Sequence, residues 1–120
     1  MEGVFQMRLF ISEQAAAWYK KEMALSEGDH VRFYVRYGGF STIQPGFSLG
    51  VSKDTPENPG AETVVDGIHF YIEKEDLWYF NNQDFYIELN PQLEEPDFNI
   101  ASWMLVLADR YRSNQAPLSF

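Results

Sequence analysis

Hydrophobic and polar residues alternate with two different periods in the first third of the chain. From Glu13 to Leu25 the apolar residues recur every three or four positions, which predicts a helix. Ser12 is a suitable N-cap for this helix, and Gly28 is a stop signal beyond its end. This helical period, followed by the two-residue period of the next segment, predicts a helix followed by a sheet.

The strand pattern begins directly after this helix. Over residues 31–37 apolar and polar side chains alternate, as in a strand with one buried face, and Gly38-Gly39 ends the run. Shorter alternating or apolar segments predict further strands at residues 47–52, 64–65, 68–72 and 85–89, with a short strand or lead-in at residues 7–11. Asp66-Gly67 predicts a turn. The segment 54–61, with its two prolines, predicts an exposed loop.

The last part of the chain returns to helical spacing. Apolar residues lie at i, i+3, i+4, i+7 and i+11, which predicts a second helix: Ile100, Trp103, Met104, Leu107 and Tyr111. The order of elements favours an α+β fold, in which the N-terminal helix packs on a small, mostly antiparallel, twisted β-sandwich or barrel. We expect a core domain over residues 1–99, and a C-terminal helix and tail over residues 100–120.

Composition narrows the possible classes of protein. The 120 residues are 45% hydrophobic and 17% aromatic, enough for one packed core. The formal charge of −9 argues against a nucleic-acid partner, because phosphate binding needs clustered Lys and Arg. No apolar run is long enough to predict a membrane span. The absence of cysteine excludes disulfides and thiolate ligands, and together these features predict a cytoplasmic protein.

An ordered series of short motifs carries a family resemblance. It runs through Ser12-Glu13, then Gly28-Asp29-His30-Val31-Arg32-Phe33, then Arg36-Tyr37-Gly38-Gly39-Phe40-Ser41, then Gly46-Phe47-Ser48-Leu49-Gly50, and on to Asn90-Pro91. This series resembles the HesB-like family, which includes the A-type iron–sulfur carrier and assembly proteins. The resemblance covers roughly residues 7–99 and implies a compact α+β domain.

The resemblance also marks what this chain lacks. Carriers of that family hold their cluster through three cysteines, one after the Gly-Gly turn and two near the C-terminus. Here the first position is Phe40, and the other two fall near Asp97 and Asn99. Phenylalanine has no donor atom, so the family's usual ligation of a cluster is excluded. We therefore expect no cofactor.

Two groups of residues suggest a surface for a ligand or a protein partner. Arg32 and Arg36 lie on one face of a predicted strand and could contact an anion or an acidic segment. The alternative is pairing within the sheet, with acids such as Glu73 or Glu88. The double glycine could instead help to form the rim of a small pocket, made of Tyr37, Gly38, Gly39, Phe40, Ser41 and Gln44. The alternative there is a tight bend that simply requires glycine.

Carboxylates gather where the family keeps its cysteine pair. Glu94, Glu95 and Asp97 could offer oxygen ligands to a divalent metal; the alternative is a solvated acidic loop around Pro96. Glu73, Glu75 and Asp76 are interpreted as exposed turn residues rather than as catalytic acids.

We expect a non-enzymatic HesB-like binding or interaction module. Its expected partner is a protein, which the resemblance associates with iron–sulfur cluster assembly, and the expected assembly is a homodimer or larger. One alternative is a cysteine-independent protein that binds or delivers iron or another divalent metal. Another is a small-molecule enzyme on a β scaffold, which would need a pocket with at least two converging ionisable groups.

Overall fold

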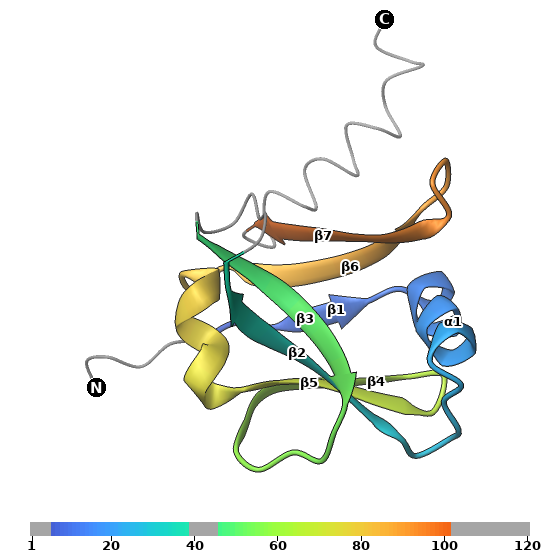
Figure 1. Ribbon diagram of the computed structural model, residues 1–120, viewed down its shortest axis with the longest axis horizontal. Coiled ribbons are helices and arrows are strands. Elements are labelled where there is room, and N and C mark those ends of the chain that lie inside the picture. Colours follow the sequence, from blue (N-terminus) through green and yellow to red (C-terminus); the bar gives the residue numbers. More distant parts are fainter. Residues whose placement is uncertain (1–5, 39–45, 102–120) are drawn as a thin grey trace, which may run out of the picture.

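The computed structural model describes residues 6–38 and 46–101 (Figure 1). Seven strands, one α-helix and one 3-10 helix follow one another: β1 (Leu9–Ile11), α1 (Glu13–Glu22), β2 (His30–Tyr37), β3 (Phe47–Lys53), β4 (Pro59–Val65), β5 (Ile68–Glu73), η1 (Lys74–Phe80), β6 (Asp84–Asn90) and β7 (Glu95–Ala101). Within these residues, neither helical segment has the length and apolarity that a membrane crossing requires.

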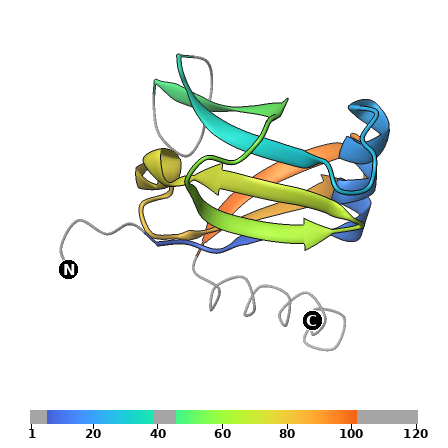
Figure 2. The same cartoon turned by 90° about the horizontal axis from the view of Figure 1, so that it is seen from below.

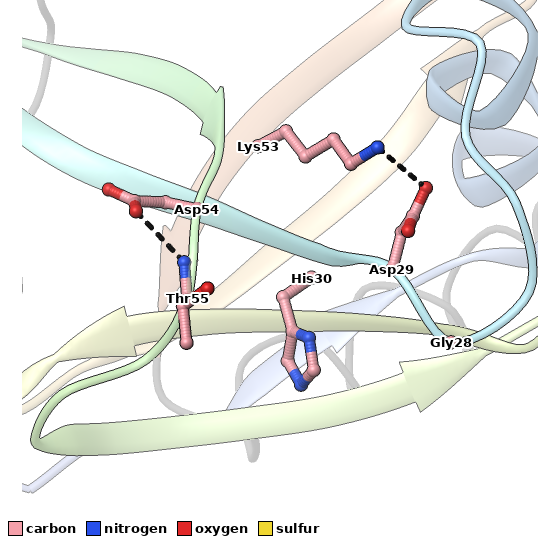
Figure 3. Close-up of a pocket in the computed structure, with 6 residues that line it drawn as sticks. All are labelled: Gly28, Asp29, His30, Lys53, Asp54 and Thr55. Atoms are coloured by element: carbon pink, nitrogen blue, oxygen red, sulfur yellow. Dashed lines mark hydrogen bonds and ion pairs between the residues drawn. The ribbon is translucent and has the colours of Figure 1, made fainter.

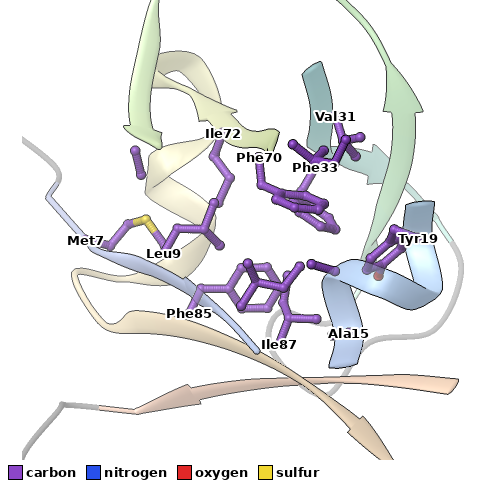
Figure 4. Close-up of a cluster of buried hydrophobic side chains, with 14 of the residues drawn as sticks. Met7, Leu9, Ala15, Tyr19, Val31, Phe33, Phe70, Ile72, Phe85 and Ile87 are labelled. Carbon is purple, nitrogen blue, oxygen red and sulfur yellow. The ribbon is translucent and has the colours of Figure 1, made fainter. Parts of the chain in front are cut away.

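The strands form two sheets. The four-stranded sheet has the order β3-β2-β5-β4, and the three-stranded sheet has the order β1-β6-β7. Strands adjacent in sequence pair antiparallel in β2–β3, β4–β5 and β6–β7, whereas β2–β5 and β1–β6 are parallel. Figure 1 shows the two sheets facing each other, with the cluster of Figure 4 between them.

The core between the sheets is largely aromatic and aliphatic. Strand β2 contributes the apolar side of its alternating pattern through Val31 and Phe33, both 0% exposed. The apolar residues of β3 are only partly buried and pack against this core. Figure 4 shows Phe70 and Ile72 of β5 above Phe85 of β6 in the same cluster. Burial of these side chains is the main source of stability for a chain without disulfides.

The expected α+β class is wrong, because the described chain is mostly β. The expected packing of the N-terminal helix on a sandwich is wrong as well. Helix α1 lies at one end of the two sheets, as Figures 1 and 2 show. Only three of its ten residues are buried, Ala15, Ala16 and Tyr19, so its apolar stripe is too narrow to cover a sheet face.

Helix α1 begins as expected and ends earlier than expected. The Ser12 hydroxyl accepts a hydrogen bond from the N–H of Ala15 at 3.1 Å, which confirms the predicted N-cap. The helix ends at Glu22, and the stop is Ala24 in the left-handed region (φ 52°) rather than Gly28. The N–H of Leu25 donates to Lys20 O, and Leu25 itself is buried. These contacts form a Schellman motif, which ends the helix and places Leu25 in the core.

Two segments that were not expected to be strands belong to the sheets. Strand β4 begins at Pro59, inside the expected loop, and its register shifts between Pro59 and Ala61. Strand β7 occupies residues 95–101, so the expected start of the C-terminal helix at Ile100 is wrong: Ile100 pairs with Phe85 of β6. The rest of the expected C-terminal helix, after residue 101, lies outside the described residues.

Candidate functional site

Arg32 is tied to its own chain. Its guanidinium contacts the carboxylates of Asp76 at 3.1 Å and Glu75 at 3.3 Å, and lies 5.8 Å from the ring centroid of Tyr34. Asp76 also accepts a hydrogen bond from the N–H of Val35, at 3.4 Å. Arg32 therefore forms ion pairs within its own chain, with Glu75 and Asp76 rather than with the expected Glu73 or Glu88.

Glu73, at the end of β5, and Glu75 and Asp76, in η1, were predicted to be exposed turn residues, which is wrong for Glu73 and Asp76. Glu73 and Asp76 are 5% and 8% exposed. The Glu73 carboxylate accepts hydrogen bonds from the N–H groups of Glu57 and Asn58, at 2.8 and 2.7 Å. Burial raises the pKa of Asp76, while its hydrogen bond from Arg32 opposes that rise. Both carboxylates fix backbone and neighbouring side chains in place.

Arg36 differs from Arg32 although both lie on one face of β2. It is exposed, and among the described residues it makes no ion pair. A Cβ at Gly50 of β3 would collide with the Tyr34 ring and approach Arg36 Cδ at 2.8 Å. Glycine at this position therefore lets both side chains lie directly against β3.

Three aromatic residues meet at the far end of β2 and β3. The rings of Tyr37 and Phe47 are in edge contact at 5.6 Å, and those of Phe47 and Trp78 at 5.1 Å. We call Tyr37, Phe47 and Trp78 the aromatic cluster. Tyr37 is 92% exposed. Gly38, with φ +93°, closes the end of the strand pair through a hydrogen bond from its N–H to Gly46 O, at 2.7 Å.

The predicted surface is thus only partly described. Arg36 and Tyr37 end β2 and Gly38 follows it, whereas Arg32 lies near the start of this strand. Outside the described residues lie Gly39, Phe40, Ser41 and Gln44. Sequence reasoning missed Phe47 and Trp78. Phe47 was interpreted only as a strand residue, and Trp78 as part of an unassigned apolar segment. The signal that could have found Phe47 is pairing across a hairpin, because Tyr37 and Phe47 are direct partners in register.

A shallow hollow of about 350 Å³ lies at the other end of β2 (Figure 3). Its lining consists of Gly28, Asp29, His30, Lys53, Asp54 and Thr55. Asp29 contacts Lys53 Nζ at 3.2 Å and accepts a hydrogen bond from the N–H of Ser26, which lowers the pKa of Asp29. A carboxylate held ionised in this way serves as a structural partner and is a poor proton donor.

The two histidines of the chain lie side by side across β2 and β5. His30 and His69 are register partners, and their rings stack with centroids 4.6 Å apart. Within the part of the chain that the structure describes, no group of three or more His, Asp or Glu side chains is arranged to hold a metal ion. Of the proposed carboxylate ligands, Glu94 precedes β7 and Glu95 lies on it, and Asp97 accepts a hydrogen bond from the Asn90 side chain.

Comparisons with known proteins give a clear set of relatives, although no family model matches the chain. A Bacillus subtilis (strain 168) protein named "Pyruvate dehydrogenase inhibitor" is 51% identical over 92 residues, which cover 77% of this chain and 97% of that protein. An uncharacterized protein of Staphylococcus saprophyticus is 39% identical over 92 residues, covering 74% of this chain and 94% of the relative.

Likeness to solved structures is weaker. A solution NMR structure of a protein from Aquifex aeolicus gives a TM-score of 0.49 at 18% identity, covering 85% of this chain and 98% of that one. This likeness is too low to support an argument about function. The HesB-like resemblance is not tested by these comparisons and stays a prediction.

Proposed function

The chain belongs to the family that includes the pyruvate dehydrogenase inhibitor of Bacillus subtilis, and we propose that it binds pyruvate dehydrogenase and lowers its activity. The observation that carries this proposal is the 51% identity over 97% of that relative. The similarity extends over nearly the whole inhibitor, so it is not a single shared motif.

The proposed action is binding rather than catalysis. Three carboxylates that could serve as acids or bases are engaged structurally: Asp76 binds Arg32, Glu73 binds a loop, and Asp29 binds Lys53. A binding protein needs a stable scaffold and a surface, and the packed two-sheet core supplies the scaffold. This agrees with the non-enzymatic interaction module expected from the sequence. An association with iron–sulfur assembly stays a separate prediction.

The test is a titration of purified Bacillus subtilis pyruvate dehydrogenase with this protein, followed by the rate of pyruvate oxidation. The rate should fall as the protein is added, level off near a fixed molar ratio, and recover on dilution. Gel filtration should show a complex at the same ratio. Heat-unfolded protein is the control.

Two outcomes would contradict the proposal. An unchanged rate at large molar excess, with no complex, would remove pyruvate dehydrogenase as the partner. Inhibition by far less than one equivalent, persisting after this protein is removed, would indicate an enzyme that modifies its target.

A further inference from the structure

Tyr37 is an exposed side chain with a rigid support. It is 92% exposed, yet its ring rests on Phe47, and Phe47 rests on Trp78. Trp78 in turn contacts Tyr79, which is 0% exposed. The edge contacts therefore form an unbroken path from solvent into the core. An aromatic side chain held in this way loses little conformational entropy when a partner covers it.

Among the described residues, Arg36 is the arginine that makes no ion pair. In the described residues, Arg8 pairs with Asp84 and Arg32 pairs with Asp76, both at 3.1 Å. Arg36 is exposed and has no such partner, in a protein whose formal charge is −9. The Tyr34 ring and the Arg36 stem lie together against Gly50, which fixes where this charge is presented. An unmatched arginine in an acidic protein favours a carboxylate on the partner.

These features lie at one end of the molecule. Arg36 is the second-to-last residue of β2 and Tyr37 is the last. Trp78 lies near the end of η1. Arg36 and Tyr37 leave β2 on opposite faces. A partner that binds around the end of the β2–β3 hairpin can therefore contact both Arg36 and Tyr37. Tyrosine, tryptophan and arginine are also the residue types that contribute most to binding at protein interfaces.

We propose that Arg36 and the aromatic cluster form the surface through which this protein contacts pyruvate dehydrogenase. This inference rests on the proposed function. The site on the enzyme presents an apolar side chain to Tyr37 and Trp78, and an aspartate or glutamate to Arg36. The carboxylate follows from charge complementarity, and the apolar group follows from the partly exposed rings.

The test compares two surface variants with two matched controls, by titration of Bacillus subtilis pyruvate dehydrogenase. Tyr37→Ala and Arg36→Glu should each raise the concentration needed for half-inhibition by at least about tenfold. Leu93→Ala removes an apolar side chain that is 65% exposed, from the turn between β6 and β7. Lys21→Glu makes the same charge change on α1. Helix α1 and the turn between β6 and β7 lie at the end of the molecule away from η1 (Figure 1). Both controls should therefore change half-inhibition less than about twofold.

Two further measurements separate contact from folding. The thermal unfolding midpoint of Tyr37→Ala and Arg36→Glu should match that of the wild type, because both side chains are exposed. Raising the salt concentration should weaken inhibition by the wild type and should have less effect on Arg36→Gln, which lacks the charge.

The outcomes distinguish the two proposals. If the wild type inhibits and both surface variants inhibit equally well, the proposed surface is wrong and the proposed function stands. If the wild type does not bind or inhibit the enzyme, both are overturned. A loss of inhibition that is equally large in Leu93→Ala and Lys21→Glu would also overturn this surface.

Discussion

Phe33 and Tyr37 show how one strand serves two purposes. Both are aromatic, both occupy the inward-facing positions of β2, and they lie four residues apart. Phe33 is 0% exposed and its ring contacts those of Tyr19, Phe70, Phe85 and Phe98. Tyr37 is 92% exposed, and its described ring contact is with Phe47.

Phe33 and Tyr37 have the same place in the alternating pattern of the strand. Their exposure differs because different elements lie opposite them. Strand β2 pairs with β5 only from His30 to Arg32. Beyond Arg32 the neighbour of β2 on that side is η1. Phe33 still lies between the two sheets, whereas Tyr37 extends beyond them. Alternation therefore reports which side of a strand faces inward, but it does not report where the opposite layer ends.

Truncating the two side chains should give opposite results. Phe33→Ala should lower the free energy of unfolding by about 3–5 kcal/mol, since it leaves a cavity among four rings. Tyr37→Ala should change it by less than about 0.5 kcal/mol. Urea unfolding followed by fluorescence measures both. Equal losses would mean that Tyr37 belongs to the core, and the comparison would fail.

The acid Asp76 of η1 contacts β2 at two positions, the Arg32 side chain and the N–H of Val35. Asp76→Ala should cost about 2 kcal/mol, because it leaves the partly buried Arg32 without its closest carboxylate and the N–H of Val35 without its acceptor. Glu75→Ala is the matched control. The Glu75 side chain is 76% exposed, so its loss should cost less than about 0.5 kcal/mol.

Hydrogen exchange should locate the effect of Asp76→Ala. Amides at Val35 and beyond should exchange faster in the variant, while the amide of Phe33 changes less, because Phe33 remains packed on all sides. Similar acceleration at both positions would show that β2 opens as one unit.

Local sequence signals were sufficient for much of this fold. The Ser12 cap and strands β2, β3, β5 and β6 follow from capping, alternation and turn residues, all of which act over a few positions. The first part of strand β4 and the whole of strand β7 were missed because Pro59 and Pro96 are unfavourable in strands. Both strands lie at sheet edges, where proline is tolerated.

The site was less predictable because it depends on contacts between distant residues. Arg32 and Asp76 are 44 positions apart in the sequence, and no local pattern pairs them. The contact of Trp78 with Phe47 depends on η1 lying beside β2. Which of the described arginines lacks an ion pair could be known only after these partners were placed.

A smaller effect is expected from Glu73, which anchors the connection between β3 and β4. Glu73→Gln keeps the size of the side chain but leaves one oxygen to accept from two N–H groups, those of Glu57 and Asn58. The free energy of unfolding should fall by about 1–2 kcal/mol. Glu62→Gln, at an exposed position of β4, is the control and should change little. Inhibition by Glu73→Gln should stay unchanged, because this connection lies away from the aromatic cluster.

The smallest effect at neutral pH is expected from a second comparison, between Tyr71 and Tyr37. Tyr71 is 1% exposed, and burial, with smaller contributions from Asp54 and Glu73, raises the pKa of Tyr71 from 10.0 to about 12. Between pH 10 and about 12 the native state retains the Tyr71 hydroxyl proton, which the unfolded state has lost. The stabilisation is therefore present below pH 10 and is lost as the pH rises towards 12.

Tyr71→Phe should remove this dependence. At pH 7 the variant should be within about 1 kcal/mol of the wild type, because the hydroxyl makes no hydrogen bond to the described residues. Between pH 10 and 12 its free energy of unfolding should fall less steeply than that of the wild type, as measured by urea unfolding at each pH. Tyr37→Phe, at the 92% exposed position, should follow the wild-type curve. If the Tyr71→Phe and wild-type curves coincide, the buried hydroxyl does not cause the alkaline loss, and the two tyrosines would differ in exposure alone.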